Sequence, residues 1–307
     1  MDDYRHPLSR YRSGVYDSNR WQRFSARAGD IIIATPVKSG TTWMQMICAL
    51  LIFQRTTLDR SLDLISPWLD MQIRGIDDVI ADLEAQQHRR FIKTHTPLDG
   101  LPNDPAVTYI CVGRDPRDVA ISWAHHSDNI NLQALFSARD RAVGNDDLAE
   151  MYRDFEPAPT DSLGRFWRWV DDSAEGELTH ASLASLMHHL ATFWEVRDQP
   201  NVVLVHYADL QRDLEGEMRR IARRLDIDLD EDRVPDLVAA AGFDAMRERA
   251  DEIAPDSTYG ILANNRAFFH RGGSGQWQEL LDEAGRGRYA ERVKQLAPPD
   301  LIEWVHR

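Results

Sequence analysis

Short apolar runs recur along the chain and alternate with longer amphipathic stretches. Four runs rich in β-branched or aromatic residues, at 30–34, 90–94, 106–112 and 201–207, predict buried strands. The stretches WMQMICALLIFQ, VAISWAHH, ASLASLMHHLATFWEVRD and LQRDLEGEMRRIARRLDI have patterns typical of helices. Strands alternating with helices favour an α/β fold, with a central parallel sheet flanked by helices on both faces. The more polar segments 128–165 and 250–275 predict a lid and a ligand-covering loop, or plain connections.

Composition favours one soluble domain. The 307 residues include 43% hydrophobic side chains, and Pro and Gly are scattered without forming a linker, so we expect a single domain over 1–307. The formal net charge of −14 argues against binding to nucleic acid or to an anionic membrane surface. The longest apolar run, MICALLIF, is too short to span a bilayer, and the N-terminus lacks a signal-peptide pattern. We therefore expect a cytoplasmic protein.

A glycine-bearing loop, TPVKSGTTW, joins the first predicted strand to the first predicted helix. Backbone N–H groups and the positive end of a helix dipole meet at such a loop, which makes it a site for phosphate. In a nucleoside-triphosphate loop a lysine follows the last glycine, whereas here Thr41 follows Gly40 and the lysine has moved back to Lys38. The loop therefore suits a 5′-phosphate but lacks the group that reaches a γ-phosphate, which argues against a kinase.

Basic side chains follow the next two predicted strands. Lys93 and His95 stand at the end of the second strand, and Arg114 closes the third, eight residues before Ser122. Because the carboxyl ends of parallel strands meet at one edge of a sheet, these residues are expected beside the first loop. His95 suits a general base, although a structural hydrogen bond is the plainer interpretation. Arg114 with Ser122 suits a phosphate monoester, and an ion network with Asp115, Arg117 and Asp118 is the alternative.

A late segment, FFHRGGSGQW at 268–277, combines basic side chains, three glycines and a closing tryptophan. Glycines let a backbone approach a ligand closely, and a flexible solvated loop is the alternative.

Taken together, these segments resemble the cytosolic-type sulfotransferases that use 3′-phosphoadenosine 5′-phosphosulfate (PAPS) as donor and release 3′,5′-adenosine bisphosphate (PAP). The resemblance rests on K-S-G-T-T-W, K-T-H, R-D-P-R-D-V-A-I-S and the late glycine loop, in that order from about residue 20 to 285. It implies a fold like that of P-loop nucleotide kinases and transfer of a sulfuryl group to the hydroxyl of a small-molecule acceptor. His95 would be the base, Lys38 and Lys93 would stabilise charge, and no metal would be needed.

The resemblance also implies which residues hold the donor. The 5′-phosphosulfate would be held by Lys38, Ser39, Gly40, Thr41 and Thr42, and the adenine by Trp43, Tyr207 and Phe243. The 3′-phosphate would be held by Arg114, Ser122, His270, Arg271 and Gly272.

Some positions depart from the family pattern. Ala241 stands where a threonine is expected, so one adenine contact would be missing. His270 replaces an arginine, Arg271 a lysine and Gln276 an aspartate. The family's short dimerisation pattern is not found after Trp277, so a homodimer stays an open expectation. A small-molecule or nucleotide kinase and a non-catalytic nucleotide-binding protein are the alternative functions.

Overall fold

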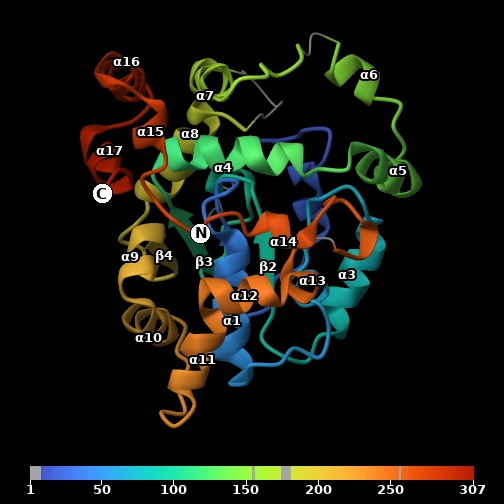
Figure 1. The fold of residues 1–307 in the computed structure, drawn as a ribbon. Coiled ribbons are helices and arrows are strands. Elements are labelled where there is room, and N and C mark those ends of the chain that lie inside the picture. The colour runs from blue at the N-terminus through green and yellow to red at the C-terminus, as the bar shows by residue number, and fades with distance from the viewer. Residues whose placement is uncertain (1–7, 154–155, 174–180, 256) are drawn as a thin grey trace, which may run out of the picture.

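A parallel four-stranded sheet lies at the centre of the computed structural model, which describes residues 8–153, 156–173, 181–255 and 257–307 (Figure 1). Its spatial order is β2-β1-β3-β4. The strands are β1 (Ile31–Ala34), β2 (Phe91–Thr94), β3 (Thr108–Gly113) and β4 (Val202–His206). Each strand lies within two residues of its predicted bounds, so the predicted parallel sheet is confirmed.

Helices cover both faces of the sheet, because successive strand residues point to opposite sides. Ile31 and Ile33 belong to one apolar cluster, whereas Ile32 and Ala34 belong to the other. The first cluster is completed by α1 (Thr41–Phe53), α2 (Leu62–Ile65), α9 (Tyr207–Arg212), α10 (Leu214–Arg224), α11 (Val234–Ala241), α12 (Phe243–Glu248) and α13 (Ala250–Ile253). The second is completed by η1 (Ser18–Arg23), α3 (Ile76–Ala85), α4 (Pro116–Asp128), α7 (Ser162–Asp171), α8 (Leu183–Trp194), α16 (Glu283–Lys294) and α17 (Pro299–Val305).

The two helices that begin at the carboxyl edge of the sheet start differently. In α4, Pro116 is the first residue, and the Asp115 carboxylate accepts the Arg117 N–H at 3.0 Å. In α1, the cap is Gly40, which provides no side-chain acceptor. The first-turn N–H groups of α1 therefore have no side-chain cap.

The segments predicted to be irregular contain short helices. Residues 128–165 include α5 (Leu132–Val143) and α6 (Leu148–Met151), and residues 250–275 include η3 (Ser257–Tyr259) and α14 (Asn265–Phe268). The lid and the ligand-covering loop stay predictions beside the alternative of exposed connections, and 154–155 and 256 lie outside the described residues. Only α5 has buried apolar side chains, Leu135 and Ala138, which pack in a small cluster with Met71, Ile73 and Ile261, whereas α6 and α14 bury none. The small number of buried positions explains the weak periodicity.

The remaining short helices are η2 (Leu98–Gly100) and α15 (Trp277–Leu280). Within the described ranges, no helix combines the length and apolar character needed to cross a membrane.

The starts of β1 and β2 are joined by a buried ion pair. Arg90 Nε donates to Asp30 Oδ1 at 2.9 Å, and only 2% and 3% of the two side chains are exposed. We expect Asp30→Ala to lower the free energy of unfolding by about 3–5 kcal/mol, because it leaves the guanidinium buried without its partner. Urea denaturation measures the effect.

The matched control is Asp77→Ala, which removes an Arg–Asp pair whose side chains are 60% and 80% exposed. Its expected effect is within about 1 kcal/mol. Equal losses in the two variants would contradict a stabilising role for the buried pair.

Candidate functional site

The loop between β1 and α1 has the shape of a cradle for an anion. Lys38 and Gly40 both have positive φ, 62° and 105° respectively. A Cβ on Gly40 would approach the Tyr207 ring to 3.0 Å, so the position favours glycine on two grounds. Thr41 and Thr42 follow in the first turn of α1 and line a cavity. Uncapped N–H groups at the start of a 13-residue helix are suited to bind an anion.

Positive side chains crowd this cradle. Burial, together with the charges of Arg114 and Lys93, lowers the pKa of Lys38 to about 7. The chain has three lysines, Lys38, Lys93 and Lys294, and the first two line the cavity. Their Nζ atoms lie over aromatic rings, Lys38 at 4.1 Å from the Phe268 centroid and Lys93 at 4.5 Å from that of Trp68. An anion in the cavity would relieve the repulsion between these groups.

The His95 ring is held in one orientation. Its Nδ1 lies 2.7 Å from the Thr35 carbonyl oxygen, which can only accept, so Nδ1 carries the proton and Nε2 the lone pair. The edge of Trp68 packs against it, with ring centroids 4.7 Å apart. Burial and the Lys93 charge hold the pKa of His95 well below its usual range. His95 is therefore neutral and able to accept a proton through Nε2.

A buried carboxylate supports the strand end that carries His95. Asp70 accepts the Thr94 and Thr96 hydroxyls at 2.7 and 2.5 Å and the Trp21 indole N–H at 3.2 Å. Burial raises the pKa of Asp70 despite these donors. The carboxylate thus fixes the backbone on both sides of His95.

Three aromatic side chains form a second wall. Trp43 Nε1 donates to the Ala241 carbonyl at 2.8 Å, and the Trp43 and Tyr207 rings meet edge to face at 5.2 Å. Phe243 packs so closely on Gly272 that a Cβ there would lie 2.5 Å from its ring. Ala241 thus contributes its backbone where the family pattern expects a threonine hydroxyl.

The late glycine loop is tied to β3 and α4. Arg114 donates to the carbonyls of Lys38 and Gly273 at 3.0 and 3.1 Å. Asp118 accepts the N–H groups of Gly275 and Gln276 at 2.8 and 3.1 Å. The alternative of an ion network is therefore wrong for these two side chains, although it holds for Arg117, which pairs with Asp115 at 2.6 Å. The loop is a defined structure that covers the cradle.

His270 and Arg271 lie on the exposed side of this loop. The His270 ring packs against that of His125 in a tilted arrangement, with centroids 3.9 Å apart. Burial and the charges of His125 and Arg271 lower its pKa, so His270 is largely neutral at pH 7.

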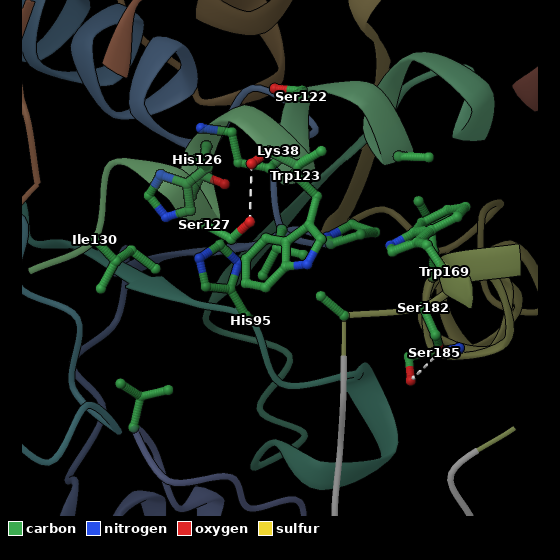
Figure 2. Close-up of a pocket in the computed structure, with 18 of the residues that line it drawn as sticks. Lys38, His95, Ser122, Trp123, His126, Ser127, Ile130, Trp169, Ser182 and Ser185 are labelled. Carbon is green, nitrogen blue, oxygen red and sulfur yellow. Dashed lines mark hydrogen bonds between the residues drawn. The ribbon is translucent and has the colours of Figure 1, made fainter. Parts of the chain in front are cut away.

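One cavity of about 840 Å³ joins these parts. Nearly all predicted site residues line it, namely Lys38, Gly40, Thr41, Thr42, Trp43, Lys93, His95, Arg114, Ser122, Tyr207, Phe243, His270, Arg271 and Gly272. Ser39 is the exception, because its side chain is buried beneath the loop and its Oγ has no partner among the described residues. Figure 2 shows Ser122 on the opposite side of α4 from Trp123 and His95.

Two contributors, Asp70 and His126, were missed from the sequence, and Asp118 was assigned to the wrong partners. Asp70 and Asp118 act largely on hydroxyl or backbone groups, which no residue spacing reveals. His126 lines the cavity from α4, near Lys38 and His95 (Figure 2). The sequence signal for His126 is its place three residues after Trp123, a spacing that puts both side chains on one face of a helix.

Known proteins are similar in sequence to this chain over most of its length. The sulfotransferase domain family matches residues 28–298. A glycolipid sulfotransferase of Mycobacterium bovis is 46% identical over 98% of this chain and 96% of its own length. The luciferin sulfotransferase of Photinus pyralis is 24% identical over 85% of this chain and 69% of its own length.

Solved structures share the fold. Retinol dehydratase in complex with androsterone and PAP superposes with a TM-score of 0.67 over 93% of this chain and 89% of its own, at 20% identity. A mouse sulfotransferase complexed with PAP gives a TM-score of 0.66 over 94% and 92%, at 18% identity. The predicted P-loop-kinase-like α/β fold is thereby confirmed. On the family match and the full-length identity to its relatives, the chain belongs to the sulfotransferase family.

Proposed function

We propose that this sulfotransferase moves a sulfuryl group from PAPS to a hydroxyl of a glycolipid. The observation that carries the proposal is the crowding of Lys38 by the positive charges of Arg114 and Lys93 in the cavity that His95 lines. Such a site binds a ligand with several negative charges beside a group that can take a proton. The PAP bound in two related structures is a molecule of this kind.

Each part of the donor has a group suited to it. The first-loop residues Lys38 to Thr42 would hold the 5′-phosphosulfate. Trp43, Tyr207 and Phe243 would contact the adenine. The 3′-phosphate would be held by Arg114, Ser122, His270, Arg271 and Gly272. The covered Arg114 Nε has no partner among the described residues, which is consistent with a bond completed by a ligand or by a small rearrangement on binding.

The transfer needs one proton acceptor and charge stabilisation. His95 Nε2 takes the proton of the acceptor hydroxyl as its oxygen forms a bond to sulfur, in line with the breaking S–O bond to the 5′-phosphate. The electron pair of that bond leaves with PAP, where Lys38 offsets the new charge, and Lys93 stabilises the transferring group. The donor's negative charge offsets the two lysines and so raises the basicity of His95.

The acceptor side of the cavity is suited to a molecule with an apolar and a polar part. One wall is apolar, with Trp68, Met71, Ile130, Leu135 and Ile261. Another is polar, with Arg165, Arg168, Asp172, Ser182, Ser185 and His188. A lipid chain and a sugar headgroup match these two walls, and the relatives at 46% identity are named glycolipid sulfotransferases. Among phenols, alcohols, lipids and sugars, we therefore favour a glycolipid.

Binding of PAP tests the donor. PAP at ~100 times its dissociation constant should raise the free energy of unfolding by roughly 2.7 kcal/mol. Chemical denaturation with and without PAP measures it, and ATP with Mg²⁺ at the same concentration is the control. Because Thr41 stands where the kinase lysine would be, ATP should stabilise the protein less. Stabilisation by ATP–Mg²⁺ but not by PAP would favour the kinase alternative.

The pH dependence of PAP binding tests Lys38. Its pKa of about 7 in the free protein must rise when an anion binds, so binding takes up a proton above pH 7. The affinity should fall by up to about tenfold per pH unit above pH 7 and lose this dependence below it. Calorimetry in buffers of different ionisation enthalpy measures the uptake.

The control for this measurement is Lys38→Arg, because arginine stays protonated throughout the range. The variant should bind PAP with little pH dependence between pH 7 and 9. The same slope in both proteins would assign the proton to another group.

Replacement of His95 tests the base. His95→Ala should bind PAP with unchanged affinity, while kcat falls by roughly 10²-fold or more. Turnover with labelled donor and calorimetry with PAP measure the two effects. A variant with wild-type turnover would remove His95 from the mechanism. If the wild-type protein bound PAP but turned over no acceptor, a non-catalytic nucleotide-binding protein would be favoured.

A further inference from the structure

His126 lies in the cavity among the groups assigned to the reaction. It comes from α4, and its ring meets Phe268 edge to face at 5.7 Å and Trp123 at the same distance. The charges of Lys38, in the loop between β1 and α1, and of Lys93, in β2, act on it together with the ring of His95, directly after β2. Figure 2 shows His126 on the same side of α4 as Trp123 and near His95.

The His126 ring has no structural hydrogen bond. Neither of its nitrogens bonds to any residue in the described part of the chain, and Nδ1 is covered by protein. Other buried histidines differ, since His189 Nε2 lies 3.2 Å from the Ala34 carbonyl and His206 Nε2 lies 3.2 Å from that of Val305. A phenylalanine would fill the same space without an unpaired nitrogen, so packing does not account for a polar ring here.

The chemistry of this ring differs from that of His95. Burial and the nearby lysines hold the pKa of His126 well below its usual range, so the ring is neutral. The bond to Thr35 fixes the tautomer of His95, but no such bond fixes that of His126. A neutral imidazole of either tautomer can donate one hydrogen bond and accept one, which suits a hydroxyl group rather than an anion.

We propose that His126 hydrogen-bonds a second hydroxyl of the acceptor, next to the hydroxyl that His95 deprotonates, and so selects acceptors with neighbouring hydroxyls such as sugar rings. This inference rests on the proposed function, because it requires the acceptor to enter the cavity beside His95. Trp68 lines the same cavity, and its covered indole N–H likewise has no partner among the described residues.

The test compares two probes with alkyl chains of similar length, octyl glucoside and 1-nonanol. Binding of each to the enzyme–PAP complex is measured by calorimetry, and kcat/KM is measured for octyl glucoside. His126→Phe should weaken octyl glucoside roughly tenfold and change 1-nonanol by less than about twofold, because only the sugar has a second hydroxyl. His126→Asn, which keeps a donor and an acceptor, should stay within about threefold of wild type.

Two controls keep the outcome interpretable. PAP affinity shows that each variant is folded. His88→Phe makes the same change outside this cavity, where His88 packs on Phe53 at 4.9 Å, and should leave both probes unaffected. Equal losses for the two probes in His126→Phe, or no loss for either, would overturn the role of His126 alone. Octyl glucoside that neither binds nor reacts with the wild type would overturn the glycolipid acceptor as well.

Discussion

The burial of like positive charges at the carboxyl edge of the sheet is the constraint on which this site depends. Burial, and after it the charges of Arg114 and Lys93, lowers the pKa of Lys38 to about 7, so its ammonium loses much of its preference for the charged state. Such an arrangement is unfavourable in the folded protein by itself, so the surrounding structure must hold it in place. A donor with phosphate groups on the 3′ and 5′ positions of its ribose would relieve the repulsion, and part of its binding energy would come from that relief.

Two buried carboxylates hold the backbone around these positive side chains in place, and neither is bonded to Lys38. Asp70 accepts hydrogen bonds from Thr94, Thr96 and Trp21, and Asp118 accepts them from the backbone of the late loop. Each has a raised pKa because burial outweighs its hydrogen bonds. Asp70 thus fixes the strand end that carries His95, and Asp118 fixes the late glycine loop over the proposed nucleotide site.

Much of this architecture could be predicted from the sequence because it follows from local patterns. Apolar β-branched runs identified all four strands, and the rule that parallel strands share a carboxyl edge brought Lys38, His95 and Arg114 together. Asp118 was misjudged because its partners are backbone groups, which residue types do not reveal. His126 was missed because the cavity-facing side of α4 depends on how that helix is rotated against the sheet. The cytoplasmic location and the homodimer stay predictions.

The ties of the late loop bear on how the spent nucleotide leaves. Arg114, the residue expected to grip the 3′-phosphate, also bonds to the Gly273 carbonyl, and Ser274 Oγ bonds to the Gln211 side chain at 2.8 Å. The Arg114 guanidinium therefore both anchors the late glycine loop and is expected to bind the 3′-phosphate. With Arg114 holding the 3′-phosphate as proposed, displacement of the loop would also weaken the hold on PAP, so the two movements would be coupled in product release.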